Sequence, residues 1–138
     1  PKADIAICTL VIEVLKAIID KQFCTLQAQK LWTKQDLFLI LDDGIKNAEN
    51  SIIENIPYLK LFGLNKVSTM NDVWKHLYKK VKPKINKNHH KSIELILEEG
   101  TLSTRLLKVI GSDISEAHII EVYQKLQSCL IENKMFQP

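Results

Sequence analysis

Glycine and proline are scarce in this sequence, with four of each among 138 residues. β-Sandwiches and barrels use both residues at their many turns. No stretch of useful length alternates apolar and polar residues, and no internal repeat or low-complexity tract occurs. The hydrophobic fraction of 46% and the charged fraction of 25% are typical of a folded globular chain. The composition therefore predicts a globular and almost wholly helical protein.

Cysteine is also sparse and badly spaced for cross-linking. The three cysteines are Cys8, Cys24 and Cys129, an odd number without a CxxC spacing. Such a set is a poor disulfide framework and a poor zinc site. Cys8 and Cys129 stand among apolar residues, so we expect both to be buried as small hydrophobic side chains. This usage favours the reducing cytoplasm as the location of the protein.

Arginine is nearly absent, because Arg105 is the only one. The net charge is +3 and almost every basic residue is lysine. Nucleic-acid sites favour the bidentate guanidinium group, so the charge census argues against a nucleic-acid partner. The stretch from Lys75 to Lys91 holds seven lysines and no acid. We interpret it as a solvated face, although a phosphate, an acidic partner or RNA stays open.

Familiar catalytic and metal-binding motifs are missing. The sequence contains no GxxxxGK[ST], GxGxxG or HExxH motif and no nucleophile elbow. His89 and His90 are adjacent, so on a helix they point about 100° apart and do not form a ligand pair. The acidic pairs Asp42–Asp43 and Glu98–Glu99 each stand beside a glycine, which is typical of solvated turns. We expect no catalytic residue, no metal site and no cofactor in this chain.

The first predicted helix, over residues 3–20, is apolar nearly all round. One stripe combines residues at helical spacing: Ile5, Cys8, Ile12, Leu15 and Ile19. Charged residues interrupt the helix, and its apolar run is too short to cross a membrane comfortably. A helix of this kind needs neighbours on several sides. We therefore expect it to be the buried centre of a helical bundle and expect no membrane partner.

Capping signals divide the rest of the chain into further helices. Helical spacing and capping residues predict helices over 33–52, 55–64, 69–82, 85–99, 102–110 and 113–130. We favour a continuous helix through Gly44, although a break there stays open. Thr33 with Asp36 and Asp113 with Glu116 resemble capping boxes, and Ser68 or Thr69 caps another helix. Around Thr25 a short helix extending to Trp32 is an ambiguous alternative. The overall prediction is an all-α bundle of five to seven helices forming a single domain over residues 1–138.

Two short stretches carry more information than the rest. The first runs from Glu54 to Leu64, and Asn55 is placed to cap a helix that Gly63 ends. The second runs from Ile96 to Arg105, with Gly100 ending one helix and Thr101 capping the next. Turn and cap chemistry is sufficient to explain the second stretch. The alternative is an anion site formed by Arg105 and the helix N-terminus, and both interpretations can hold together.

These two stretches resemble the C-terminal helical part of the carboxylate–amine ligases of the glutamate–cysteine ligase type. That family carries an ENRWxAxRYGL-like segment and, some forty residues later, an ileeGTgAxRq segment. The first is matched by Glu54, Asn55, Gly63 and Leu64, with Phe62 in place of a tyrosine. The second is matched by Gly100, Thr101 and Arg105, with Ser103 in place of an alanine. The resemblance covers about residues 50–130.

The resemblance implies an ATP- and magnesium-dependent enzyme that joins a carboxylate, usually of glutamate, to an amine. In that family the catalytic groups lie on an antiparallel sheet, which would precede Pro1. The chain begins without a methionine, so we expect a fragment whose missing sheet is its partner. Asn55, Thr101 and Arg105 would then bind or brace the substrate. The alternative function is a non-enzymatic helical interaction module, and a homo-oligomer stays open.

Overall fold

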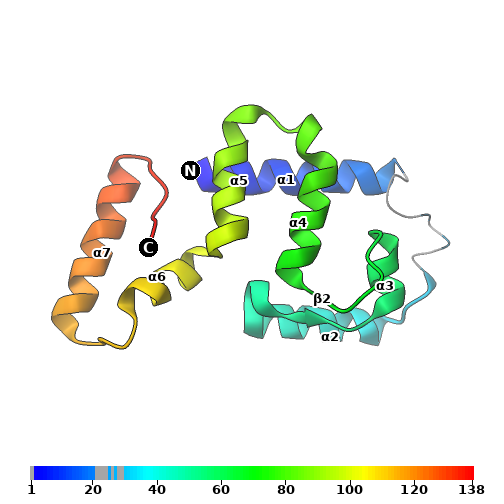
Figure 1. Cartoon of the computed structure of the whole chain (residues 1–138), viewed down its shortest axis with the longest axis horizontal. Coiled ribbons are helices and arrows are strands. Elements are labelled where there is room, and N and C mark those ends of the chain that lie inside the picture. The colour runs from blue at the N-terminus through cyan, green and yellow to red at the C-terminus, as the bar shows by residue number, and fades with distance from the viewer. Residues whose placement is uncertain (1, 21–24, 26, 28–29) are drawn as a thin grey trace. The chain divides into compact units, whose positions relative to one another are not determined.

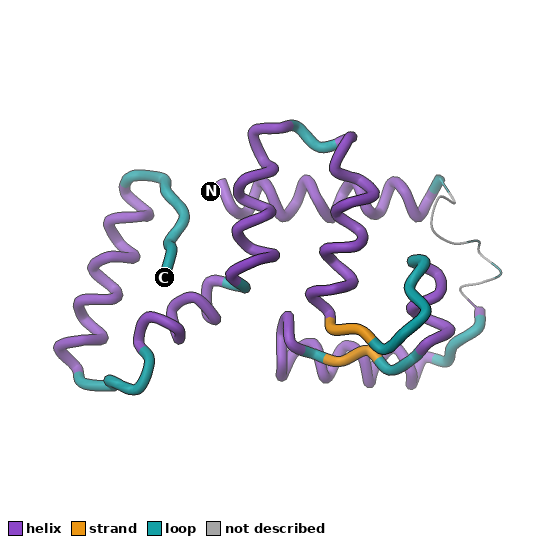
Figure 2. Tube along the Cα trace, in the orientation of Figure 1, coloured by secondary structure: helices purple, strands orange, loops and turns teal. Residues whose placement is uncertain are grey.

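The computed structural model describes residues 2–20, 25, 27 and 30–138. Seven α-helices lie within these residues, together with two strands of two residues each (Figures 1 and 2). The prediction of an all-α bundle of five to seven helices is confirmed. No helix in the described part of the chain is long and apolar enough to cross a membrane. The predicted helix around Thr25 lies largely outside the described residues.

The chain divides into two compact units. The terminal unit comprises residues up to Cys8 and Asn86–Pro138, and the middle unit comprises Thr9–Ile85. The first helix, α1 (Lys2–Ile19), begins in the terminal unit and ends in the middle unit. Each unit has its own buried side chains.

Helix α1 is buried on one side only. Its buried residues are Ala6, Leu10, Val14 and Ala17, which follow one another at helical spacing. The opposite stripe is exposed: Ile5, Cys8, Ile12, Leu15 and Ile19. The prediction of neighbours on several sides, and with it the prediction of a buried Cys8, is therefore wrong. Periodicity reveals that a face is apolar, but it does not reveal which of two apolar faces has a partner.

The middle unit contains α2 (Lys34–Asn47), α3 (Ile56–Leu61) and α4 (Met70–Val81). A 3₁₀ turn over Ala48–Asn50 follows α2, and a second one over Lys82–Lys84 follows α4. Helix α2 passes through Gly44 without a break, as predicted, and ends five residues before Ile52. Strands β1 (Ile52–Ile53) and β2 (Ser68–Thr69) pair antiparallel, with Ile53 opposite Ser68. These strands are too short for sequence alternation to reveal.

Helix caps in the middle unit follow the predictions closely. Thr33 and Asp36 form the predicted capping box of α2. Thr69, rather than Ser68, caps α4 in a second box with Asp72. The core lies where α1, β1, α3 and α4 meet: Leu10, Val14, Ala17, Ile53, Leu59, Phe62, Val73, Leu77, Tyr78, Val81 and Ile85.

The terminal unit contains α5 (Lys87–Glu99), α6 (Leu102–Ile110) and α7 (Glu116–Ile131). Helix α6 has the predicted limits, with Gly111 at its end. Ser115 caps α7, so the predicted Asp113–Glu116 box is wrong. Instead, the Asp113 carboxylate accepts a hydrogen bond from the Ser115 backbone N–H at 3.0 Å. After α7 the chain turns back beside that helix, and the Lys134 N–H donates to the Cys129 carbonyl at 2.8 Å (Figure 1).

Candidate functional site: a buried arginine in a small cavity

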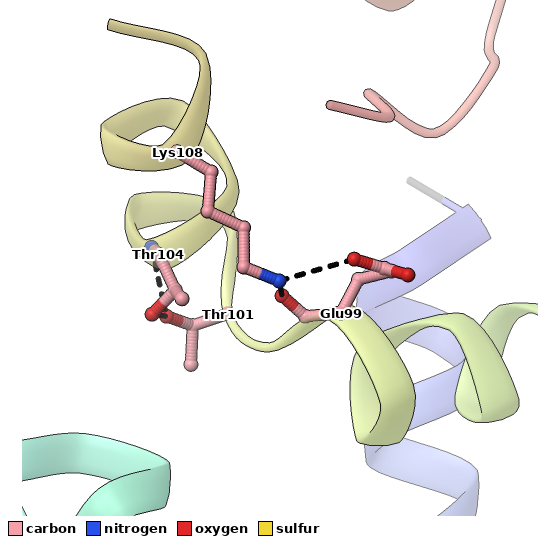
Figure 3. A network of polar contacts seen from close by, with 4 residues as sticks. All are labelled: Glu99, Thr101, Thr104 and Lys108. Carbon is pink, nitrogen blue, oxygen red and sulfur yellow. Dashed lines mark hydrogen bonds and ion pairs between the residues drawn. The ribbon is translucent and has the colours of Figure 1, made fainter. Parts of the chain in front are cut away.

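The candidate site begins at the turn between α5 and α6. Gly100 ends α5 in the left-handed region, with φ +89°, where a side chain would be strained. The hydroxyl of Thr101 then accepts a hydrogen bond from the Thr104 N–H at 3.4 Å and contacts the Thr104 hydroxyl at 3.1 Å (Figure 3). The predicted turn-and-cap role of Gly100 and Thr101 is confirmed. The cap fixes the start of α6, whose first turn carries Arg105.

Lys108 forms an ion pair with Glu99, the acid whose charge acts on Arg105. Its ammonium group donates to the carboxylate of Glu99 and to the Glu99 backbone carbonyl, both at 3.1 Å (Figure 3). Lys108 and Glu99 are roughly half exposed at this ion pair. Glu99 therefore already has a cationic partner and a helix C-terminal carbonyl group beside it.

Arg105 is buried, with 4% of its surface exposed. Its Nε and Nη1 groups have no hydrogen-bond partner in the part of the chain that the structure describes. Burial lowers the pKa of Arg105, and the charge of Glu99 raises it in part. A guanidinium group stays protonated in proteins, so a buried positive charge with unused donors remains. Burying such donors without acceptors costs free energy that a bound acceptor would recover.

Arg105 lines a cavity of about 240 Å³ within the terminal unit. The cavity wall comes from the start of α1, the ends of α5 and α7, the first turn of α6 and the segment after α7. Most lining side chains are apolar, among them Ile7, Ile96, Leu102, Leu126, Leu130 and Phe136. A few polar groups in a mostly apolar pocket are typical of small-molecule sites. The structure thus brings Thr101 and Arg105, both predicted as site residues, to one cavity.

The other charged residues of this cavity are exposed to solvent or paired. Lys134 donates to Glu132 at 2.6 Å, a bond that raises the pKa of Lys134. Lys2 and Asp4 are both exposed and of opposite charge. Water solvates such exposed groups at little cost. Arg105 is therefore the one buried cation among the described residues that line this cavity.

Asn55, the third predicted site residue, lies in the middle unit. Its side-chain oxygen accepts a hydrogen bond from the Tyr58 N–H at 3.0 Å, so Asn55 caps α3 as predicted. It does not line the Arg105 cavity. Its role toward a substrate stays a prediction, and its structural role as a cap accounts for the contact seen.

The middle unit contains a smaller cavity of a different character. It has a volume of about 180 Å³ and lies between α1, α3 and α4. Its wall is apolar and aromatic, and includes Val14, Ile53, Tyr58, Phe62, Val73 and Trp74. The rings of Tyr58 and Phe62 pack edge to face at 5.3 Å between centroids. No charged residue lines it among those described, so this cavity lacks a charged group that would bind an ionic ligand.

The acidic pairs take part in local structure. Asp42 pairs with Lys46 at 2.7 Å, and Asp43 accepts a hydrogen bond from the Ile52 N–H at 2.8 Å. Across residues 2–20, 25, 27 and 30–138, no group of three or more His, Cys, Asp or Glu side chains is placed to hold a metal ion.

Sequence reasoning missed most of the cavity wall. Leu126, Cys129 and Leu130 lie on the apolar face predicted for the last helix, but their spacing does not indicate that this face borders an opening. Lys2 and Phe136 are far from Arg105 in the sequence, and no local signal links them to it. Comparison of the chain with protein-family models, with curated proteins and with solved structures finds no match.

Proposed function

We propose that the chain binds a carboxylate-bearing small molecule at Arg105, as the non-catalytic helical region of an ATP-dependent carboxylate–amine ligase. The observation that supports the proposal is that Arg105 lines a cavity and has two buried nitrogen atoms, Nε and Nη1, that lack acceptors among the described residues. A carboxylate matches the fork of an arginine with two parallel hydrogen bonds. It would also neutralise the buried charge.

The first turn of α6 adds further attraction for an anion. The N–H groups of Leu102 and Ser103 are first-turn donors, which have no acceptor within their own helix. The helix dipole places partial positive charge at the same end. Together with Arg105, this end of α6 favours a negative ligand group over a neutral one.

The ligase assignment rests on the resemblance carried by Gly100, Thr101 and Arg105. In an enzyme of that kind, ATP and magnesium would bind on the sheet expected before Pro1, and this chain would hold the carboxylate substrate. We therefore expect no phosphate release from ATP when the chain alone is mixed with glutamate, cysteine and magnesium. Measurable turnover by the isolated chain would contradict the non-catalytic part of the proposal.

Calorimetric titration of the chain with a simple carboxylate tests the binding part. Hydrogen bonds to charged groups contribute about 1.5–3 kcal/mol, so Arg105→Gln should weaken binding roughly 10- to 100-fold. Lys125→Gln is the matched control, because Lys125 is an exposed cation on α7 that pairs with Glu121 and lies outside the cavity. If both variants bind like the wild type, or if no carboxylate binds, the proposal fails.

A second candidate function, a helical interaction module, is supported by α2. None of its residues is buried, although it carries apolar side chains that are 42–75% exposed: Leu37, Phe38, Leu39, Leu41 and Ile45. Exposed apolar patches of this kind mark interaction surfaces. Sedimentation velocity over a range of concentrations tests this candidate. Self-association that Leu39→Lys abolishes would favour it, and a concentration-independent monomer would remove self-association from consideration.

A further inference from the structure

We propose that the ligand of the Arg105 cavity is a small monocarboxylic acid with an apolar body of about five to eight carbon atoms. This inference rests on the proposed carboxylate role of Arg105 and narrows the class of acid. Three observations support it: the size of the cavity, its mostly apolar wall, and the burial and pairing of each charged residue that lines it.

The charges of the cavity accommodate one anionic group. Arg105 is buried and has unused donors, whereas Lys134 already pairs with Glu132. The charges of Lys2 and Asp4 at the same cavity offset each other. A second carboxylate would therefore meet no unpaired buried cation among the described lining residues, and it would lose its own hydration. This favours a monocarboxylate over a dicarboxylate such as glutamate and over a polyphosphate.

The wall supplies the second element of recognition. The same cavity that Arg105 lines is also lined by apolar residues from four different segments: Ile7, Ile96, Leu126, Leu130 and Phe136. Phe136 is itself buried, with 4% exposed. An apolar ligand body would remove this wall from water, which is the main source of affinity for an uncharged chain.

The volume sets the size of that body. A dry apolar cavity of about 150 Å³ accepts benzene. The present cavity of about 240 Å³ has room for a body of that size together with a carboxylate. A short-chain aliphatic acid or a simple aromatic acid fits this description, and long-chain fatty acids exceed it.

A series of straight-chain acids tests the inference. Acetate, butyrate, hexanoate and dodecanoate are titrated into the full chain by calorimetry, with hexanol, glutarate and inorganic phosphate as comparison ligands. We expect affinity to rise about fourfold per added methylene group up to hexanoate. Dodecanoate should gain nothing further over hexanoate. Hexanol should bind at least tenfold more weakly than hexanoate, because it leaves the guanidinium group without a charged acceptor.

Two substitutions at neighbouring positions of α7 distinguish the contribution of the cavity wall to affinity from a general effect of changing the surface. Leu130 lines the cavity and is 60% exposed, so Leu130→Gln should fold and should weaken hexanoate binding more than acetate binding. Ile131 is 78% exposed and does not line the cavity, so Ile131→Gln should leave both affinities unchanged.

The outcomes distinguish this inference from the function on which it rests. Equal affinity for acetate and hexanoate, or tighter binding of glutarate, with binding lost in Arg105→Gln, would overturn the monocarboxylate inference and leave the carboxylate role intact. Tighter binding of phosphate than of every carboxylate would overturn both. Failure of every anion to bind would overturn both.

Discussion

The two units differ in the charge of the polar residues that they bury: among the described residues these are the neutral Ser51 and Ser68 in the middle unit and the cationic Arg105 in the terminal unit. In the middle unit the helix starts at α2, α3 and α4 are satisfied by Thr33, Asn55 and Thr69, and the cavity wall is apolar. In the terminal unit Arg105 lines a cavity, and its buried Nε and Nη1 atoms have no hydrogen-bond partner among the described residues. Natural proteins accept such local costs mainly at functional sites. The comparison supports the proposal that the terminal unit binds a ligand, and it predicts that the middle unit supplies most of the stability.

The buried apolar side chains also suggest that the middle unit supplies most of the stability. The middle unit draws its core from α1, β1, α3 and α4, including the fully buried Leu59. The apolar core of the terminal unit is thinner: Ala6, Ile93, Leu97, Val122 and Phe136. A region with fewer buried contacts opens more readily, which suits a site that must admit a ligand.

The largest change in the free energy of unfolding is expected from a substitution in the core of the middle unit. Leu59→Ala removes a side chain with no exposed surface, and such truncations lower the free energy of unfolding by about 2–5 kcal/mol. Urea unfolding followed by circular dichroism measures the change. Leu59→Met, which nearly conserves volume, is the control and should cost less than about 1.5 kcal/mol. A loss below 1 kcal/mol for Leu59→Ala would contradict the assignment of stability to this core.

The second largest change is an increase in the free energy of unfolding, expected from a substitution in the terminal unit. Arg105→Met removes a buried charge with two unpartnered donors and keeps an apolar chain of similar length. We expect the ligand-free variant to gain about 1–3 kcal/mol in the free energy of unfolding, because unsatisfied buried donors cost about that much. The variant should also lose carboxylate binding. A loss of stability would mean that Arg105 is satisfied in the folded chain and has a structural role.

Two glycines in the middle unit should respond to the same substitution with opposite signs. Gly63 has φ +84°, and its added Cβ would lie 3.2 Å from the Lys80 ammonium group, which donates to the Phe62 carbonyl. Gly63→Ala should therefore lower the free energy of unfolding by about 1–2 kcal/mol. Gly44 lies inside α2, where an added Cβ would make an ordinary contact of 3.8 Å with the Met70 methyl group. Gly44→Ala should raise the free energy of unfolding by up to about 1 kcal/mol. Thermal unfolding measures both variants, and shifts of the same sign and size would contradict this account.

The smallest effect concerns pH and the cap of α2. Hydrogen bonds from the Thr33 backbone N–H and hydroxyl lower the pKa of Asp36 below the ordinary aspartate value of 3.8. Because the folded pKa lies below the unfolded one, this stabilisation is present above about pH 4 and is lost as pH falls through the folded value. The difference in urea midpoint between wild type and Asp36→Asn should therefore be larger at pH 7 than at pH 2.5. A difference independent of pH would show that the carboxylate charge contributes nothing.

Local chemistry explains which elements could be predicted. Helix α6 was located to the residue because Gly100, Thr101 and Gly111 leave no other start or end. The start of α7 was misplaced because Asp113 and Ser115 are both good capping residues, and only the backbone path decides between them. The burial of Cys8 was predicted wrongly because both faces of α1 are apolar and tertiary contacts select one.

The candidate site was predictable only in part, for the same reason. Thr101 and Arg105 are four residues apart on a capped helix, so their association follows from local structure. Lys2, Leu126 and Phe136 join the cavity through tertiary packing, which a single sequence does not encode in any local pattern. The burial of Arg105 without acceptors for its Nε and Nη1 could not be predicted either, because it depends on every segment packed around the side chain.

The most direct test of the central claim uses the fact that Arg105 is the only arginine in the chain. Its Nε–Hε group gives a single arginine side-chain signal in a ¹⁵N-correlated proton spectrum. We predict that titration with hexanoate moves this signal saturably downfield, as the N–H acquires a carboxylate acceptor, and that hexanol does not. A signal that stays in place while hexanoate is added would contradict the account.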